Sequence, residues 1–518
     1  MKKYSLKIAA MLVLFFMTLD GFAQITPQGL QQFLQEKKTA DIEKIKRFYN
    51  RLNYQAIWLK KQGDCKIIFD NIKNAAGLGL NQKDYDIDFM QSFFNGKINL
   101  KSITDSLEAE VTITTIAIHF YTDMAYGNAK PVFGYDGMHY PEMDRDIPVM
   151  LADYISNKNL MSLQYNLSSG VPEIAVLQNK IRWYSAIMND SNFKEIIDVP
   201  VKPGINNKSL LVKLYQMGIA GELTDKLPDS TLKRLIKIAQ LQFGLLSDGV
   251  IRSTLVEELN IPLIIRLRQL DLAINYYRWL NRVSSEQPVV VVNIPAAYMK
   301  VYNNKNIIMD MRMVVGKPST PTPTLTSTIT EVILYPYWHV PTSIATKEML
   351  PILKRNPEYI NTGGFQVLDK NGKIINPLSI KWSALSRTYF PYTIRQSTGC
   401  DNALGLIKLN FYSPYGVYLH DTPTKNAFAM NKRYFSHGCM RMEKPMELGH
   451  LVMANNSIAI DTLELKGCLR NQSPVTVRAT RQLPVIVWYN PAGIDAEEHL
   501  VFYDDVYGKF HWWNIFLD

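Results

Sequence analysis

The chain has 518 residues, of which 47% are hydrophobic and 20% are charged, and its formal net charge at pH 7 is +10. This composition excludes an intrinsically disordered chain, and the length favours two to four domains that each bury their own core. The positive charge is dispersed, without a long block of Lys or Arg, which is typical of a solvated surface. We therefore expect no nucleic-acid partner.

The first 23 residues have the pattern of a secretory signal peptide. Three lysines precede an apolar run over residues 8–17, and the small residues Gly21 and Ala23 follow it. This run is shorter than a helix that spans a bilayer. We predict a signal peptide over residues 1–23, export of the protein and no stable membrane span after cleavage. A retained N-terminal anchor is the alternative.

Four cysteines, Cys65, Cys400, Cys439 and Cys468, are too few and too scattered for a disulfide framework. The chain has no Cys-x-x-Cys pair, so a zinc site is disfavoured, and we predict no metal and no cofactor. If Cys439 is a free thiol, at least one of the other three is unpaired, and the sequence does not choose among them.

The N-terminal half has the periodicity of helices. Apolar residues recur at helical spacing between Ile42 and Leu52, and a second helical segment over residues 106–125 ends at Gly127. We predict a helical scaffold domain over residues 28–200 and a compact helical module over residues 206–262. A long helix over residues 262–280 leads out of that module.

The pattern changes to β-strands from Pro288 onward. Strands are predicted over residues 289–293, 297–302, 307–315, 332–338, 406–410, 416–420, 485–489 and 501–503. We predict a long Pro- and Thr-rich loop over residues 317–330 and an insertion over residues 341–395, which is a candidate lid. The predicted fold class is multidomain α+β, with a mainly β domain over residues 287–510.

A cysteine-nucleophile site is predicted between Tyr418 and Arg441. His420 ends a predicted strand, the turn that follows it allows the chain to return, and Ser436-His437-Gly438 forms a sharp turn before Cys439. A thiol attacks as the thiolate, which a neighbouring imidazole can generate. The amides of Gly438 and Cys439 are candidate oxyanion donors.

The remaining residues of this stretch have weaker assignments. Arg441 is suited to hold a carboxylate through a bidentate contact, and a structural salt bridge is the alternative. His437 has either a direct catalytic role or the role of holding the turn. An isolated Cys or His is usually a packed or satisfied side chain, so the prediction depends on their occurring together.

His420, the spacer over residues 421–435 and the motif Ser436-His-Gly-Cys-Met-Arg441 resemble the signature of L,D-transpeptidases with a YkuD-type catalytic domain. The motifs Pro336-Tyr-Trp, Asp401-Asn-Ala-Leu-Gly and Pro414-Tyr-Gly-Val-Tyr resemble the larger, periplasmic branch of that family, the YcbB type. By this resemblance, residues 206–262 are similar to its peptidoglycan-binding-like module and residues 341–395 to its capping insertion. Asn is common in the broader family where Arg441 stands.

The resemblance implies a reaction. Cys439 would attack the carbonyl of meso-diaminopimelate at position three of a tetrapeptide stem, release the terminal D-alanine and form a thioester that an acceptor amine resolves. His420 would activate the thiol, with a backbone carbonyl near Asp421 orienting its ring. The resemblance also implies substrate contacts from Arg441, Tyr418, Ser436 and Trp338, and it implies peptidoglycan stem peptides as partners: a tetrapeptide donor and a meso-diaminopimelate acceptor.

Other functions fit parts of the pattern. The same fold serves an L,D-carboxypeptidase or a transpeptidase that attaches other molecules to the wall, and these differ in which acceptor reaches the thioester. A non-catalytic wall-binding protein would not need Cys439 and His420 together. A papain-like protease would place its Cys before its His in the chain, whereas here His420 comes first.

Overall fold

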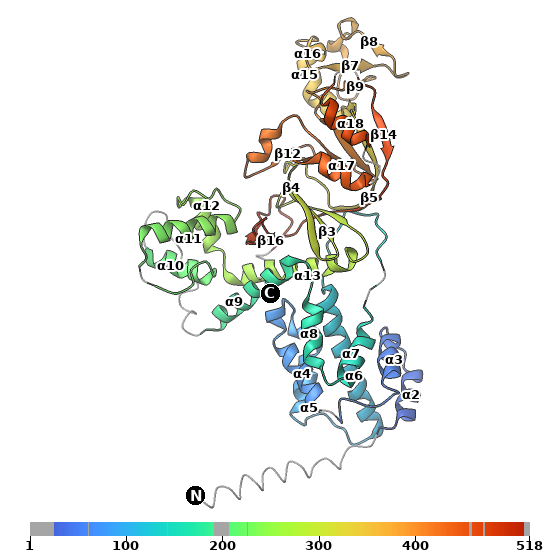
Figure 1. Ribbon diagram of the computed structural model, residues 1–518, viewed down its shortest axis with the longest axis vertical. Helices are drawn as coiled ribbons and strands as arrows, with labels where there is room; N and C mark the ends of the chain where they lie inside the picture. The colour runs from blue at the N-terminus through green and yellow to red at the C-terminus, as the bar shows by residue number, and fades with distance from the viewer. Residues whose placement is uncertain are drawn as a thin grey trace, which may run out of the picture. The chain divides into compact units, whose positions relative to one another are not determined.

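The computed structural model describes residues 25–60, 62–141, 143, 145–190, 207–224, 226–454, 458–469 and 472–511 (Figure 1). The predicted signal peptide, residues 1–23, lies outside the described residues. The chain divides into a helical unit (Met1–Lys130, Pro141–Leu235 and Ile251–Arg282) and a mainly β unit (Pro131–Tyr140, Ile236–Val250 and Val283–Asp518). Among the described helices, none is both long enough and apolar enough to cross a membrane.

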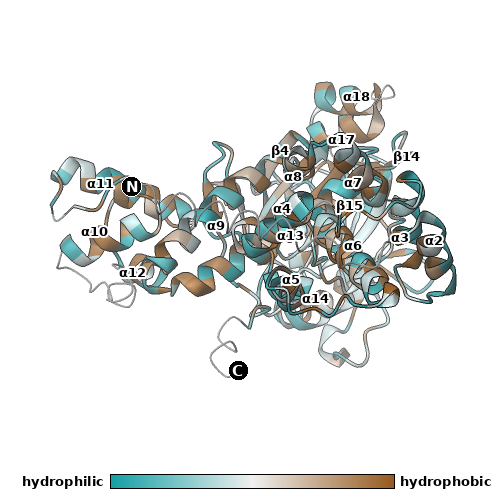
Figure 2. Ribbon diagram, turned by 90° about the horizontal axis from the view of Figure 1, so that it is seen from below, coloured by the Kyte–Doolittle hydropathy of each residue, from teal (hydrophilic) through white to brown (hydrophobic). Residues whose placement is uncertain are grey.

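The helical unit consists of amphipathic helices around an apolar core. Helix α2 buries Leu30 and Leu34, four positions apart, and it carries both hydrophobic and hydrophilic segments in Figure 2. Its helices are α2 (Pro27–Glu36), α3 (Ile42–Arg51), α4 (Gln62–Lys73), η2 (Ala75–Leu78), η3 (Gln82–Tyr85), α5 (Ile87–Phe94), α6 (Ile103–Tyr126), α7 (Ile147–Ser156), α8 (Leu160–Ser168), α9 (Pro172–Asn189), α10 (Asn207–Gln216), α12 (Ser253–Asn260) and α13 (Leu263–Val283). Helix α11 (Asp229–Gln242) crosses the division between the units.

Helix α6 is the central element of this core. Gly127 follows its last residue, as predicted, whereas the helix begins at Ile103, earlier than the predicted start at residue 106, because Ser102 and Asp105 form a capping box there. Its Glu110 is fully buried, and the carboxylate accepts hydrogen bonds from the backbone amides of Ile57, Trp58 (3.1 Å) and Leu59 (3.1 Å). Burial raises the pKa of Glu110. The Glu110 carboxylate therefore accepts the backbone hydrogen bonds of residues 57–59, which lie outside any helix or strand.

The β unit is built on an 11-stranded sheet whose main path runs β1-β5-β10-β11-β13-β4-β3-β2-β15. Because β15 also pairs with β5, the path closes on itself around an apolar core and leaves few open edges. The strands are β1 (Tyr135–Asp136), β2 (Val289–Asn293), β3 (Tyr298–Asn303), β4 (Asn306–Gly316), β5 (Leu325–Leu334), β10 (Ile407–Phe411), β11 (Leu419–His420), β12 (Tyr434–Ser436), β13 (Met440–Met442), β14 (Val475–Arg478) and β15 (Pro484–Trp488), with a separate hairpin of β16 (Ala492–Ile494) and β17 (Leu500–Phe502).

Helices α17 (Pro445–Met453) and α18 (Ile458–Lys466) and the 3-10 helix η8 (Lys425–Ala429) accompany this sheet. Leu448 and Val452 of α17 and Leu463 of α18 are buried in the same apolar core as the strands. The fold is therefore α+β, as predicted, with a helical N-terminal part and a mainly β C-terminal part.

The insertion forms a small subdomain of its own, drawn in yellow at the end of the β unit beyond β14 and α18 (Figure 1). Its apolar core includes Val340, Leu353 and Trp382, all buried. A four-stranded sheet of order β6-β9-β7-β8 is covered by short helices. The elements are β6 (Trp338–His339), α14 (Thr342–Ile344), η5 (Ala345–Met349), α15 (Leu350–Leu353), α16 (Tyr359–Thr362), β7 (Phe365–Leu368), β8 (Ile374–Ile375), η6 (Pro377–Ser379), η7 (Trp382–Ala384) and β9 (Thr393–Gln396).

Two strand predictions need correction. The loop predicted over residues 317–330 is wrong from Leu325 onward, because β5 begins there and pairs with β10, β14 and β15. The prolines of this segment suggested a loop, but the Thr- and Ile-rich sequence after them suits a strand that has partners on both sides. The predicted strand over residues 416–420 contributes only Leu419–His420 to the sheet, since Gly416 has a φ of 65° and turns the chain.

The cysteines are now assigned. Cys400 and Cys468 form a disulfide between Cα atoms 5.3 Å apart, whereas Cys65 and Cys439 are free thiols. Cys65 is buried in the helical unit, and burial raises its pKa to about 12. The bridge fastens the loop that follows the insertion to the segment that follows α18.

Candidate active site

Three neighbouring strands align Lys408, His420 and Arg441. Lys408 of β10 lies opposite His420 of β11, and His420 lies opposite Arg441 of β13. Residues opposite each other in a sheet point to the same face, whereas the next residues along each strand, such as Leu419 and Met440, enter the apolar core. The two-residue period then places Tyr418 and Cys439 on the same face as these three side chains.

The ring of His420 is buried and its tautomer is fixed. Its Nδ1 lies 2.5 Å from the backbone carbonyl oxygen of Asp421, and a carbonyl only accepts, so Nδ1 carries the proton and Nε2 is the free base. The carboxylate of Asp421 is itself held by the amide of Leu406 (2.9 Å) and by Lys425 (2.5 Å). Burial lowers the pKa of His420 to about 3, and the charge of Arg441 acts in the same direction.

Tyr418 lies between the predicted nucleophile and the predicted base along this face. Its ring lies 5.6 Å from that of His420, and the register places it on the same face as Cys439. Burial raises the pKa of Cys439, whereas the main chain and phenol of Tyr418 and the charges of Lys408 and Arg441 lower it. Burial also raises the pKa of Tyr418.

Hydrogen bonds of two hydroxyl groups, those of Ser436 and Thr322, stabilise the turn before Cys439. Ser436 is buried, and its Oγ donates to the carbonyl of Cys439 (2.6 Å) while accepting from the amide of Gly438 (3.1 Å). Thr322 donates to the carbonyl of Gly438 (2.8 Å). Gly438 has a φ of 113°, a conformation that other residues rarely adopt.

These contacts change two predicted roles. The amide of Gly438 donates to Ser436, so in this conformation it is not free to bind an oxyanion, and the amide of Cys439 remains the candidate donor. Ser436, predicted to contact substrate, is buried and uses its hydroxyl group within the turn. The sequence showed the sharp turn but not which groups close it.

His437 points toward the insertion. Its Nε2 lies 2.7 Å from Oε1 of Glu348, in the helical segment η5, and the side chain of His437 is 35% exposed. This contact joins the residue two positions before Cys439 to the predicted lid. The contact favours the positioning role for His437 over a direct one.

The guanidinium of Arg441 is partly buried and incompletely paired. Among the described residues, its Nε has no hydrogen-bond partner. Burial lowers the pKa of Arg441, and the charge of Cys439 opposes that effect. A buried donor without a partner is costly, so this group is suited to an anionic ligand.

Comparison with known proteins assigns this part of the chain. Residues 287–460 match the family model of the YkuD L,D-transpeptidase catalytic domain, and residues 43–173 match a model described as a scaffold domain. The chain carries a YkuD-type L,D-transpeptidase catalytic domain.

Individual proteins are similar to only part of the chain. A Haemophilus influenzae protein named "Putative L,D-transpeptidase" is 31% identical over 219 residues, which cover 42% of this chain and 44% of that protein. The match thus spans less than half the length of the curated relative. An L,D-transpeptidase from Mycobacterium smegmatis (16% identity, TM-score 0.18) covers 39% of this chain and 58% of that one. L,D-transpeptidase 3 from Mycobacterium tuberculosis with a faropenem-derived adduct (14%, TM-score 0.20) covers 39% and 61%.

Trp338 lies in the insertion sheet of the transpeptidase domain. It pairs with Gln396 of β9, and its ring lies 6.2 Å from that of Phe365. With Tyr359 these rings form one wall of a cavity of about 650 Å³, whose other wall is the loop over residues 396–403. Trp338 therefore faces a cavity bounded by the insertion and its return loop, whereas Tyr418, His420, Cys439 and Arg441 gather on the main sheet.

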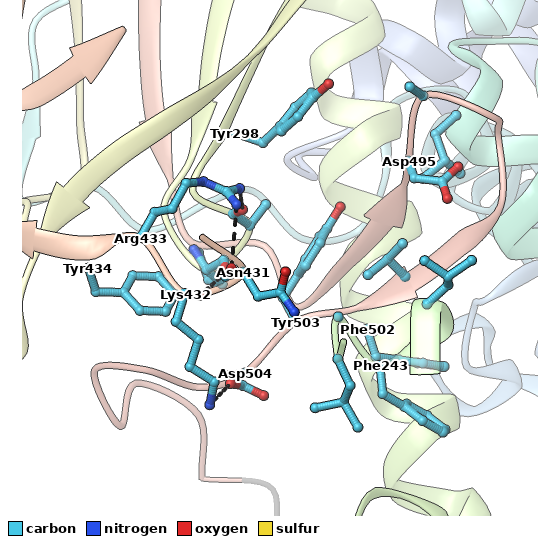
Figure 3. Close-up of a pocket in the computed structure, with 18 residues that line it drawn as sticks. Phe243, Tyr298, Asn431, Lys432, Arg433, Tyr434, Asp495, Phe502, Tyr503 and Asp504 are labelled. Atoms are coloured by element: carbon cyan, nitrogen blue, oxygen red, sulfur yellow. Dashed lines mark hydrogen bonds and ion pairs between the residues drawn. The ribbon is translucent and has the colours of Figure 1, made fainter. Parts of the chain in front are cut away.

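A second cavity, of about 260 Å³, is lined by residues 431–434, which precede the nucleophile turn, and by Phe243, Tyr298 and Phe502 among others (Figure 3). Its charged groups are bound to protein. Arg433 donates to the carbonyls of Met313, Ala297 and Met430, and Lys432 pairs with Asp504 at 3.0 Å. Arg433 thus anchors the chain just before β12 and the nucleophile turn.

One cluster of the domain has the residue types of a metal site. His450 of α17 and Asp461 and Glu464 of α18 bring their ligand atoms within 4.8 Å of one another. The Nδ1 of His450 faces Asp461 (3.7 Å) and its Nε2 faces Glu464 (3.2 Å). Each ring nitrogen is thus paired with a different carboxylate, an arrangement typical of surface ion pairs.

Sequence reasoning missed Lys408 and Thr322. Lys408 is a single polar residue between Ile407 and Leu409, which is the ordinary pattern of a half-buried strand. Only the pairing of β10 with β11 places it beside His420. Thr322 belongs to the segment that was predicted as a loop.

Proposed function

We propose that this protein is an exported, periplasmic L,D-transpeptidase that forms 3→3 crosslinks in peptidoglycan through a thioester on Cys439. The observation that carries the proposal is the strand register that places Cys439 on the same sheet face as His420, a buried imidazole whose free nitrogen is Nε2. The matched YkuD catalytic domain supports the reaction class. Assignment to the YcbB-type branch and the domain boundaries given above belong to the same proposal.

In the proposed reaction, Nε2 of His420 takes the proton of the Cys439 thiol as the sulfur attacks the carbonyl of the third stem residue. The C–S bond forms, the bond to the terminal D-alanine breaks, and the imidazolium returns its proton to the leaving amine. An acceptor amine then attacks the thioester, His420 takes the amine proton, and the thiol is regenerated. No cofactor or metal takes part.

The electrostatics of the site support an anionic substrate. Arg441 has a buried Nε without a partner among the described groups, and Lys408 carries a second positive charge on the same face. Stem peptides carry carboxylates, which a guanidinium binds through charge-assisted hydrogen bonds. Trp338 and the aromatic wall of the insertion cavity are proposed to contact the stem or its acceptor. The His437–Glu348 pair is proposed to hold the insertion against the turn.

The test is incubation of the purified protein with disaccharide-tetrapeptides and mass spectrometry of the products. We expect 3→3 dimers and released D-alanine. Cys439→Ala should abolish both products, and His420→Ala should lower the rate by about 100-fold to 10,000-fold. Cys65→Ala is the matched control, since it removes the other free thiol, which is buried in the helical unit. Dimers from the Cys439→Ala protein would refute the mechanism, and tripeptides without dimers would identify a carboxypeptidase.

A further inference from the structure

Lys408 lies next to both Tyr418 and His420 on the sheet face that carries the site. Its Nζ lies 3.9 Å from the centre of the Tyr418 ring, and its strand places it opposite His420. The register places Tyr418 and Cys439 on this same face, and the phenol of Tyr418 lowers the pKa of the Cys439 thiol. The ammonium, the aromatic ring and the thiol are therefore neighbours on one face of the sheet.

We infer that Lys408 is a positioning residue that stabilises the thiolate of Cys439 through the ring and hydroxyl group of Tyr418. The inference rests on the proposed function, in which Cys439 is the nucleophile, and it adds a residue that neither the nucleophile motif nor the matched family description contains.

The physical reason is the effect of a cation on a phenol. An ammonium over the ring face is attracted by the ring electrons and withdraws density from the hydroxyl group, which becomes a stronger hydrogen-bond donor. When the S–H proton passes to Nε2 of His420, the negative charge on sulfur receives that strengthened bond. The cation also acts directly through space, and partial burial keeps water from screening it.

The charges around Lys408 support this assignment over a purely structural one. The groups that act on it are Cys439 and, more weakly, Glu331 of β5, and it in turn acts on His339 of β6 and on His420. Among the described ion pairs within 4.0 Å, Lys408 has no carboxylate partner. Of the two cations near the sulfur, Lys408 lowers the pKa of Cys439 more than Arg441 does.

The test measures the thiolate directly. The rate at which iodoacetamide alkylates Cys439 is followed from pH 5 to pH 10 in the full-length protein, by mass spectrometry of the peptide that contains this residue. In Lys408→Met and Lys408→Gln we expect the apparent pKa of the thiol to rise by about one unit, so that alkylation at neutral pH is about tenfold slower. Lys408→Arg keeps the charge and should stay within about threefold of the wild type.

Two controls separate this role from a structural one. Lys373→Met removes one positive charge from an exposed position in the insertion, and its profile should match the wild type. In Tyr418→Phe, which lacks the hydroxyl group, the further change Lys408→Met should have less than half of its effect in the wild type. Profiles of Lys408→Met and Lys408→Gln that coincide with that of Lys373→Met would overturn the inference, and so would full additivity with Tyr418→Phe.

The two proposals fail separately, because alkylation needs no stem peptide. A shifted profile together with no crosslinked product from any form of the protein would refute the transpeptidase function and leave the role of Lys408 intact. Normal crosslinking by Lys408→Met with an unshifted profile would refute only the role of Lys408.

Discussion

Replacing Ser436 with alanine tests whether this residue braces the nucleophile turn or contacts substrate. Its hydroxyl group is buried, donates to the carbonyl of Cys439 at 2.6 Å and accepts from the amide of Gly438 at 3.1 Å. Alanine fits the same space but leaves a donor and an acceptor without partners. Each unsatisfied buried group costs about 1 to 3 kcal/mol.

The two groups together give an expected loss of local stability in Ser436→Ala of about 2 to 6 kcal/mol, which corresponds to exchange that is about 30-fold to 25,000-fold faster. Hydrogen–deuterium exchange of the peptide over residues 432–442 measures this directly. Because the turn also sets the direction of the thiol, we expect kcat in the crosslinking assay to fall and KM to change less than threefold.

The matched control is Ser379→Ala, whose hydroxyl group donates to the carbonyl of Asn376 at an exposed position (2.7 Å). Water replaces that bond, so exchange and activity should stay close to the wild type. Unchanged exchange in Ser436→Ala combined with a raised KM would refute the brace and return Ser436 to the substrate-contact role that the sequence predicted.

Three further predictions follow from buried polar groups and the disulfide. Burial lowers the folded-state pKa of His420 to about 3, below its ordinary value of 6.5, so between these two pH values the unfolded chain binds more protons than the folded chain. The free energy of unfolding should therefore fall as the pH drops from 6.5 to about 3, by up to about 1.4 kcal/mol per pH unit. In denaturant titrations, His420→Gln should flatten this fall. Glu110→Ala should destabilise the helical unit by about 3 kcal/mol in thermal unfolding, and Glu110→Gln by less because it keeps an acceptor; equal losses would contradict the role of the carboxylate as acceptor. The disulfide closes a loop of 68 residues in sequence separation, so reducing agent should lower the melting temperature of the wild type but not that of a Cys400→Ser/Cys468→Ser double variant; a shift in both would show that another bond is being reduced.

The fold was predictable where local sequence decides the structure. Runs such as Val289–Asn293 carry enough β-branched residues to read as strands, and helix α6 has both its capping box and its terminal glycine in the sequence. Strand β5 was missed in part because its Thr-rich start is stabilised by partners far away in sequence. Trp338 was read as the end of that strand, but Tyr335 has a φ of 49°, and the chain turns there into the insertion.

The site was predictable to the extent that its residues are close in sequence. The stretch from Tyr418 to Arg441 contains the thiol, the imidazole, the phenol and the guanidinium that gather on one face, so one motif identified all four. The roles of residues within the turn were harder to predict from the sequence, because the backbone amide of Gly438 can donate either to an oxyanion or to a neighbouring hydroxyl group. Lys408 was inaccessible, since the register between two strands is set by tertiary packing.

The two cations of the site act differently on His420 and Cys439, the two groups that exchange a proton in the proposed mechanism. Arg441 has the larger effect on the imidazole, where it disfavours the charged form, and Lys408 has the larger effect on the thiol, where it favours the charged form. With burial lowering the pKa of His420 and raising that of Cys439, the resting pair is neutral rather than a preformed thiolate and imidazolium. In the proposed mechanism, proton transfer then accompanies attack on the carbonyl. A carboxylate bound to Arg441 would offset the charge that opposes the imidazolium, while Lys408 would continue to stabilise the sulfur, so substrate binding itself would make His420 the stronger base.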